Sequence, residues 1–194
     1  GSGSTEIRIS SDANTVGVLV HAYNGADYVK VYAYSELAGG WQQRGQDLPY
    51  PLNLLDFDIS GDGSTLVTSA VGLDEEGRAW TLKYSVEQDN WIQIGDTIVG
   101  DAHFQYRGYL VGISDDGEIL ALGSPTAANY NGAIWLYKWD QSRESWLQLG
   151  GVIEREPYLG TSGSMRLAIS GNGSTLVTSG AGYFEAYLID REAL

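Results

Sequence analysis

Carboxylates make up most of the side chains in this sequence that could take part in acid–base or metal chemistry. The chain carries 25 Asp and Glu residues against 11 Lys and Arg, with two histidines and no cysteine. The absence of cysteine excludes a disulfide, a thiol nucleophile and a zinc–thiolate site. Paired carboxylates could serve as the acid and base of a glycoside hydrolase. Most of these carboxylates are expected to form a solvated surface, so their number alone is no evidence for an enzyme.

Three aspartates come closest to the pattern of a cation site. Asp56 and Asp58 alternate along an expected strand and so share one face, and Asp62 follows in the next turn. Hard cations need several oxygen ligands, which this group could supply. The simpler interpretation is that Asp62 only shapes the turn, as Asp116 and Asn172 do in matching segments. We therefore expect no metal, with Asp56, Asp58 and Asp62 as weak candidates, and no other cofactor.

The two histidines carry no recognisable catalytic pattern either. His21 and His103 lack the spacing of a metal motif, and no Gly-x-Ser-x-Gly segment marks a hydrolase nucleophile. The formal net charge of −14 argues against nucleic-acid binding, because an acidic surface repels phosphates. No apolar run of about 18 residues is present, so we expect no membrane insertion. The sequence predicts a protein that is not an enzyme.

The elements that position these side chains belong to four internal repeats. An Ile-Ser pair ends an expected strand at residues 9–10, 59–60, 113–114 and 169–170, and a short Asp-, Asn- or Gly-containing turn follows each pair. A second apolar strand comes next, and the segment 65–69 returns unchanged at 175–179. A third strand follows, and then a Trp-x-Gln-x-Gly strand at 41–45, 91–95 and 146–150. Units of about 50 residues with four short strands are typical of propeller blades.

The repeats predict an all-β fold, a small β-propeller of four repeat units in a single domain of residues 1–194. The approximate units are 1–50, 51–104, 105–158 and 159–194. Three blades are expected to have four strands, and the last one three as the chain stands. The Asp-Gly and Asn-Gly turns suit tight hairpins, because these residues adopt positive φ cheaply.

These repeats resemble those of FG-GAP and integrin-α-type β-propellers. Gly123-Ser124-Pro125 resembles the Gly-Ala-Pro element of that family, and Gly108 takes the place of the glycine in its Phe-Gly element. The family often binds calcium through an Asp-x-Asp-x-Asp-Gly loop between the second and third strands. The corresponding loops of this chain lack that spacing, so the resemblance does not imply calcium here. It does imply an extracellular or other extracytoplasmic location.

The first and fourth units bear on whether the blades form a ring. The fourth unit ends after its third strand, and Gln42 and Arg44 in the first unit replace the apolar pairs Ile92/Ile94 and Leu147/Leu149. A polar face on blade one is compatible with a closed ring in which it lies beside a three-stranded blade four. We expect closure. The alternative is an open arc with a polar capping unit.

The long connections carry side chains suited to recognition. Residues 46–55, 96–107 and 152–162 form connections of about ten residues or more, and long ordered loops in compact domains usually have a task. Tyrosines with short polar side chains are typical of binding surfaces. The predicted partner-binding residues are Tyr23, Asp27, Tyr50, His103, Tyr106, Tyr130, Asn131 and Tyr158. The alternative is that these aromatic side chains only fill the channel along the propeller axis.

The favoured function is a non-enzymatic binding or assembly module with a protein partner, for example an accessory subunit of a larger extracytoplasmic complex. A glycan-binding, lectin-like propeller is the first alternative. A carboxylate-dependent glycoside hydrolase and a purely structural repeat segment are the others. The fold alone does not choose between them, because propellers host many functions.

Overall fold

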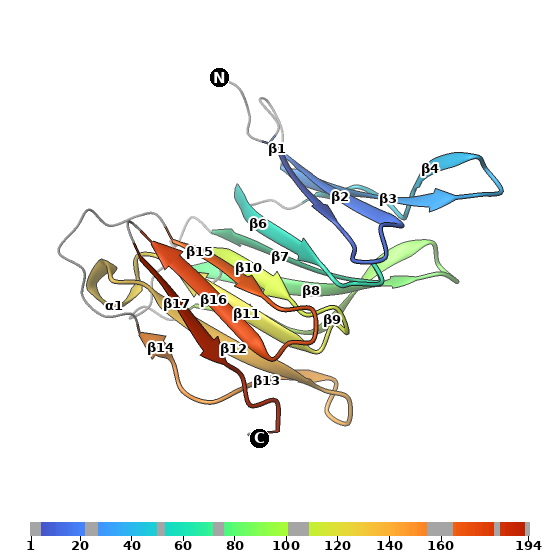
Figure 1. Ribbon diagram of the computed structural model, residues 1–194. Helices are drawn as coiled ribbons and strands as arrows, with labels where there is room; N and C mark the ends of the chain where they lie inside the picture. The colour runs from blue at the N-terminus through green and yellow to red at the C-terminus, as the bar shows by residue number, and fades with distance from the viewer. Residues whose placement is uncertain are drawn as a thin grey trace.

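The computed structural model describes residues 5–21, 27–49, 53–71, 76–100, 109–154, 165–180 and 183–192. These residues are built almost entirely of β-strands, which form four antiparallel sheets (Figure 1). One turn of helix, α1 (Ala127–Tyr130), lies between the second and third strands of the third sheet. No helix of the described residues is long and apolar enough to cross a membrane.

Each sheet corresponds to one repeat unit and is called a blade. Blade one contains β1 (Thr5–Ile9), β2 (Thr15–Val20), β3 (Tyr28–Ser35), β4 (Gly40–Gln43) and β5 (Leu48–Pro49). Blade two contains β6 (Asn53–Ile59), β7 (Thr65–Val71), β8 (Gly77–Ser85) and β9 (Asn90–Val99). Blade three contains β10 (Leu110–Ile113), β11 (Ile119–Ser124), β12 (Ala133–Asp140), β13 (Ser145–Gln148) and β14 (Ile153–Glu154). Blade four contains β15 (Arg166–Ile169), β16 (Thr175–Gly180) and β17 (Tyr183–Leu188).

The predicted fold class, an all-β propeller of four units whose last blade has three strands, is confirmed. The outermost position of blades one and three is shared by two short strands, because β4 and β5 both pair with β3, and β13 and β14 both pair with β12. Blade two has the continuous β9 there, with a register irregularity between Ala79 and Thr81. The predicted unit boundaries near residues 50, 104 and 158 lie outside the described residues and stay predictions.

The repeated Ile-Ser pairs are explained by a hydrogen-bonded turn after the first strand of every blade. In blade two, the Ser60 hydroxyl donates to Asp62 Oδ1 at 2.8 Å and accepts a hydrogen bond from the Thr65 amide at 2.9 Å. The serines of the other blades, Ser10, Ser114 and Ser170, make the same two bonds. Since one hydroxyl joins both ends of the turn, the serine fixes where the first strand ends and the second begins.

The glutamine and glycine of the Trp-x-Gln-x-Gly segments form a local motif. The Nε2 atom of the glutamine donates to the glycine carbonyl two residues later, at 3.2 Å in blades one, two and three. The glycines, Gly45, Gly95 and Gly150, have φ angles of 71°, 65° and 70°. Glycine adopts this left-handed conformation without the steric cost of a Cβ atom.

The tryptophans of blades two and three pack on the preceding blade. A Cβ atom on Gly45 would lie 2.9 Å from Cδ1 of Trp91, and Trp91 Nε1 donates to the Arg44 carbonyl at 3.0 Å. Trp146 takes the same place against Gly95, where a Cβ atom would lie 3.2 Å from its Cδ1. The two glycines therefore make room for the indole of the next blade.

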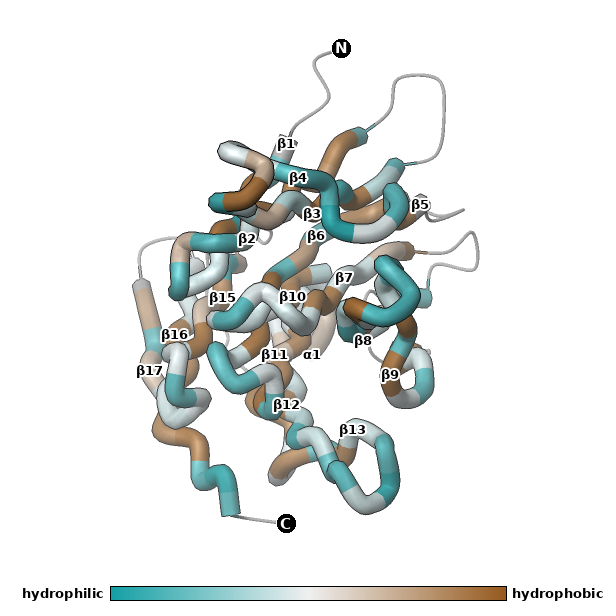
Figure 2. The backbone as a smooth tube through the Cα atoms, turned by 90° about the vertical axis from the view of Figure 1, so that its right-hand side faces the viewer, coloured by the Kyte–Doolittle hydropathy of each residue, from teal (hydrophilic) through white to brown (hydrophobic). Residues whose placement is uncertain are grey.

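The hydrophobic core lies between the blades. The inner strands β1, β6, β10 and β15 lie next to one another in that order, and Figure 2 shows blade one at the top, blade two at the right, blade three below it and blade four at the lower left. Three clusters of buried side chains join blade one to two, two to three and three to four. Their fully buried members include Phe57, Trp135 and Leu176. Each blade is thus held by its neighbours in sequence.

The expectation that the four blades close into a ring is wrong, because the outer faces of blades one and four are exposed. Ile7 and Ile9 of β1 are 62% and 60% exposed, and Phe184 and Leu188 of β17 are 75% and 90% exposed. In a closed ring these two faces would bury one another. The four blades instead form an open arc, which was the alternative.

The polar pair that favoured closure lies on the other side of blade one. The Arg44 guanidinium is 4.8 Å from the ring centroid of Tyr84 in blade two, and Arg44 Nη1 donates to the Gly63 carbonyl at 3.0 Å. Gln42 shares this face by alternation along the strand. The pair is therefore turned toward blade two, where a cation above an aromatic ring replaces the apolar contact of the other blades.

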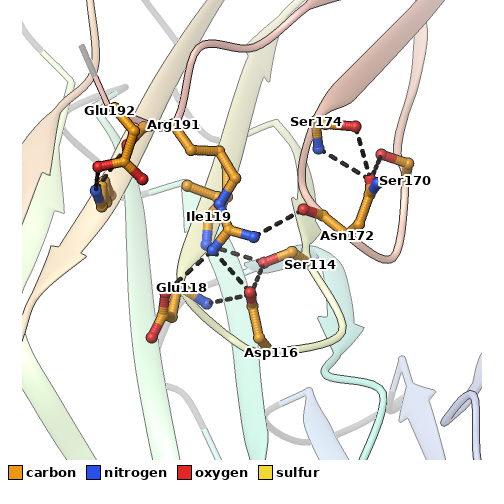
Figure 3. Close-up of polar contacts among 10 residues, drawn as sticks. Ser114, Asp116, Glu118, Ile119, Ser170, Asn172, Ser174, Arg191 and Glu192 are labelled. Atoms are coloured by element: carbon orange, nitrogen blue, oxygen red, sulfur yellow. Dashed lines mark hydrogen bonds and ion pairs between the residues drawn. The ribbon is translucent and has the colours of Figure 1, made fainter.

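Arg191 joins the segment after β17 to blade three (Figure 3). Its Nη2 lies 2.7 Å from Asp116 Oδ2 and 3.0 Å from Glu118 Oε2, and its Nη1 donates to the Asn172 carbonyl at 2.8 Å. The ammonium group of Lys138 donates to the Arg191 carbonyl at 2.6 Å. These contacts supplement the apolar packing that holds blade four on blade three.

Replacing Arg191 with alanine is expected to lower the free energy of unfolding by about 1 kcal/mol, since a guanidinium that is three-quarters buried and pairs with two carboxylates is lost. The matched control is Arg143→Ala, because Arg143 is 65% exposed and pairs with Asp140 inside its own hairpin. The control should cost about 0.3 kcal/mol. Urea unfolding at low and high salt, with hydrogen exchange of β15–β17, measures both. Equal effects of the two variants would contradict this role for Arg191.

Candidate functional site

A cavity of about 740 Å³ lies along the inner strands of all four blades. Its polar lining comes from β1, β6, β10 and β15 and from the end of β2, and includes Glu6, Arg8, His21, Asp56, Asp58, Tyr109 and Arg166. Each inner strand runs toward its Ile-Ser turn, so the molecule has a turn end and, opposite it, a connection end where the long connections begin and finish. Leu54 is the second residue of β6, Arg166 is the first residue of β15, and Tyr109 directly precedes β10. The lining therefore extends to the connection end.

Asp56 is buried at the junction of three blades. Its Oδ2 accepts a hydrogen bond from the Val111 amide of blade three at 3.0 Å, and its Oδ1 lies 2.9 Å from Arg8 Nη2 of blade one. Burial raises the pKa of Asp56 to about 7, although the Val111 amide and the Arg8 guanidinium act in the opposite direction. The carboxylate thus joins the inner strands of blades one, two and three.

Asp58 repeats this contact one step further along β6. Its Oδ2 accepts from the Ile113 amide at 3.0 Å and its Oδ1 accepts from the Ile59 amide at 2.9 Å. Burial raises the pKa of Asp58 against the effect of these two amides. The cause is the same as for Asp56, because a carboxylate removed from water favours its neutral form.

The three weak metal candidates have other partners. Asp62 Oδ1 accepts from the Ser64 amide and the Ser60 hydroxyl, both at 2.8 Å. Partial burial acts to raise its pKa, but these hydrogen bonds outweigh it and lower the pKa of Asp62. Asp62 therefore shapes the turn, as the simpler interpretation expected. Across the ranges that the structure describes, no three His, Asp or Glu side chains are grouped so that they could hold an ion.

Sequence reasoning missed the charged side chains of β1 and β15. Arg8 pairs with Asp56, and its guanidinium carbon lies 5.6 Å from the ring centroid of Phe57. Glu6 lies 3.5 Å from Arg8, and Arg166 takes the matching position in β15. The available signal was the alternation of charged residues along the first strand of units one and two, and the single Arg166 at the position in unit four that matches Glu6 and Asp56.

Of the predicted partner-binding residues, Asp27 lies at the cavity rim. Its Oδ2 is 3.0 Å from His21 Nδ1 and accepts a hydrogen bond from the Leu54 amide of blade two at 3.2 Å. This carboxylate orients the His21 ring, which lines the cavity, and ties the connection after β2 to blade two. Asp27 therefore lies at the end of the molecule opposite the Ile-Ser turns, and its role in partner binding stays a prediction.

Asn131 follows α1 in the connection between β11 and β12, and its amide donates to the Ala128 carbonyl at 3.2 Å. Tyr130 is the last residue of α1. Asn131 is not among the residues that line the axial cavity. The remaining predicted residues, Tyr23, Tyr50, His103, Tyr106 and Tyr158, lie outside the described residues.

The turn end is narrow because the four turns are joined there. The Asp12 amide donates to the Gly61 carbonyl at 3.1 Å, the Gly61 amide to Asp115 at 2.9 Å, and the Asp115 amide to Gly171 at 2.8 Å. The Ser11 hydroxyl of blade one also donates to Asp115 Oδ1 of blade three at 2.7 Å. A Cβ atom on Gly61 would lie 2.6 Å from Asp115 Cβ. Access to the cavity is therefore expected from the connection end.

Comparison with known proteins supports the fold. No family model and no curated protein matches the sequence. Among solved structures, a Bacteroides fragilis protein described as a 6-phosphogluconolactonase is 12% identical, with a TM-score of 0.64 over 98% of this chain and 52% of the other. KlAtg21, solved in complex with the coiled coil of AgAtg16, is 14% identical, with a TM-score of 0.66 over 97% of this chain and 54% of the other. The β-propeller domain of the Trilobed protease from Pyrococcus furiosus is 9% identical, with a TM-score of 0.56 over 98% of this chain and 55% of the other.

These likenesses define the chain as a β-propeller by fold and say nothing more specific about it, because the identities are too low to carry function. The chain spans about half the length of each of the three structures, at 52%, 54% and 55%. That share agrees with an open arc of blades, since nearly all of this chain superimposes on part of a longer propeller.

Proposed function

We propose that this protein is a non-enzymatic binding module that holds a protein partner at the connection end of the axial cavity. The observation that carries this proposal is the cavity itself, about 740 Å³ in volume, lined by charged groups of both signs and extending to the end of the molecule where the inner strands begin. At the opposite end, backbone hydrogen bonds join the four turns to one another. A binding role fits a site whose side chains come from all four blades.

The carboxylates of the cavity support binding over hydrolysis. Asp56 and Asp58 each accept a hydrogen bond from a backbone amide of blade three, and Asp56 also pairs with Arg8. Groups held in this way stabilise the packing of the blades. Removing them is expected to damage the fold, so they are poor candidates for a freely moving acid and base.

Arg166 indicates the chemistry of the partner that this cavity would bind. Within the described residues Arg166 forms no ion pair, and its Nη1 donates only to the Met165 carbonyl at 3.4 Å. Tyr109, 41% exposed, lies on the same cavity. An arginine and an exposed aromatic ring on the same cavity suit a protein segment that presents a carboxylate and an apolar side chain. The complex of KlAtg21 with a coiled coil supports a protein partner only by analogy of fold.

Affinity capture from the native source with matched charge variants tests the proposal. Arg166→Glu should reduce capture of the partner at least about tenfold, because it places a carboxylate opposite a carboxylate. Arg143→Glu makes the same charge change on an exposed hairpin away from the cavity and should leave capture unchanged. Full capture by the Arg166→Glu protein, or equal loss in both variants, would overturn the assignment. A glycan array probed with both variants decides the lectin alternative in the same way.

We also propose an extracellular or other extracytoplasmic location, in keeping with the FG-GAP resemblance of Gly123-Ser124-Pro125. Fractionation of the native source, with an antibody against this chain, is the test. Recovery with cytoplasmic markers would contradict it.

A further inference from the structure

The outer edge of blade four is an unpaired strand edge. β17 pairs with β16 on one side, and no strand of the described residues pairs with its other side. The Ile189 amide donates inward to the Ser174 carbonyl at 2.8 Å. Because successive residues of an antiparallel strand face opposite neighbours, the backbone groups of Ala186 and Leu188 are directed outward. This edge can accept another strand.

A small apolar pocket lies beside this edge. Its volume is about 230 Å³, and it lies between blade three and the end of β17. Leu136, Leu149, Gly150 and Ile153 line it from blade three, and Leu188, Ile189 and Asp190 line it from blade four. The pocket is separate from the axial cavity, since the two share no lining residue.

The repeats show what occupies the equivalent place in the other blades. The amides of Tyr84, Trp139 and Ile189 make the same bond to the turn of their own blade, with Ser64, Glu118 and Ser174. Ile189 therefore takes the position of Tyr84 and Trp139. In blades two and three the residue paired with this position is a tryptophan, Trp91 or Trp146.

Blade three also has the glycine, Gly150, against which the tryptophan of a following blade would pack, but no side chain lies against it. Trp91 lies against Gly45 and Trp146 against Gly95, as described above. Gly150 has the same positive φ of 70°, yet a Cβ atom there would meet nothing within 4 Å. The pocket beside Gly150 thus lies where the repeat pattern places an indole.

We propose that the β17 edge and this pocket form a binding site for an extended polypeptide segment that carries a tryptophan. The segment adds antiparallel to β17, with its tryptophan opposite Ile189 and the indole in the pocket. Its next residue then lies opposite Leu188, whose side chain is 90% exposed, so an apolar residue there is favoured. Main-chain hydrogen bonds supply affinity and the indole supplies selectivity.

A peptide with the sequence of residues 144–151, Glu-Ser-Trp-Leu-Gln-Leu-Gly-Gly, is the probe, since it contains the outer strand β13 (Ser145–Gln148) of blade three. Fluorescence anisotropy of the labelled peptide with the 194-residue chain should give saturable binding. A peptide with alanine in place of the tryptophan should bind at least about tenfold more weakly, because it leaves the pocket unfilled.

Two protein variants locate the site. Leu188→Pro removes an outward amide without breaking a bond to β16, and proline is tolerated at a strand edge. Leu188→Ala removes the same side chain and keeps the amide. The Leu188→Pro protein should bind the tryptophan peptide at least about tenfold more weakly than the Leu188→Ala protein does. The melting temperatures of both variants should stay close to that of the parent chain.

Each outcome decides the matter. Loss of binding with the alanine peptide and with Leu188→Pro supports the proposal. Absent binding of the tryptophan peptide, equal affinity of the two peptides, or equal affinity of the two variants would overturn it. Should Leu188→Pro lower the melting temperature, protection of the Ala186 and Leu188 amides from hydrogen exchange by the peptide replaces it as the readout. Arg166→Glu leaves this site untouched, so failure here is distinguishable from failure of the proposed function.

Discussion

Replacing Trp91 with alanine should lower the free energy of unfolding by about 3–5 kcal/mol. The indole is 5% exposed, fills the space beside Gly45 and donates a hydrogen bond to the Arg44 carbonyl of blade one. Its removal leaves a cavity between blades one and two and an acceptor without its donor. Both losses act at the same interface.

Trp41→Ala is the matched control, because Trp41 holds the same position in the repeat. It is 46% exposed and packs at 5.7 Å, centroid to centroid, against Tyr34 of its own blade. Its loss should cost about 1 kcal/mol. Equilibrium unfolding in urea, followed by far-ultraviolet circular dichroism, measures both variants. A cost for Trp41→Ala equal to that for Trp91→Ala would mean that the outer face of blade one is packed against something.

The stability of the protein should rise as the pH falls from about 8 to about 5, by about 2 kcal/mol from Asp56 alone. Burial raises the pKa of Asp56 from 3.8 to about 7. Between these two values the folded state holds a proton that the unfolded state releases. The free energy of unfolding therefore falls as the pH rises through this range, and the contribution is complete below a pH of about 4.

Asp56→Asn isolates this effect from the general relief of negative charge on acidification, which a chain of net charge −14 also shows. The variant cannot titrate at position 56 and keeps an oxygen for the Val111 amide. Its stability should change less with pH than that of the parent chain, by about 2 kcal/mol over the same range. Parallel pH profiles of the two proteins, from urea unfolding at each pH, would contradict the assignment to Asp56.

The blades could be predicted from the sequence because local contacts produce the repeat. Each Ile-Ser pair contains a serine whose hydrogen bonds close a hairpin turn. Each Trp-x-Gln-x-Gly segment contains a glutamine that donates a hydrogen bond to the glycine carbonyl two residues later. Such motifs need only a few neighbouring residues. The number of blades, the order of strands and the three-stranded last blade follow from counting them.

The relation between blades could not be predicted in the same way. The sequence does not show which face of its strand is turned toward blade two, so it could not tell whether Arg44 faces blade two or blade four. The contact of Arg44 with Tyr84 joins residues that are 40 positions apart in the sequence. The pairing of Arg8 with Asp56 crosses 48 residues. Alternation along a strand identifies two faces but not the neighbour of each, so the cavity lining and the open arc became visible only with the blades in place.

The chain of contacts from blade to blade has a consequence for how the molecule comes apart. Stability in such a linear stack is divided among nearest-neighbour couplings, so cooperativity has to be transmitted through each interface in turn. Blades one and four each have a single neighbour and so a single coupling. Strand β6 takes part in two couplings, because Asp56 pairs with Arg8 of blade one and accepts a hydrogen bond from the Val111 amide of blade three. Weakening blade four detaches one unit from an intact remainder. Weakening β6 loosens two of the three interfaces at once and leaves blade one separate from the pair formed by blades three and four.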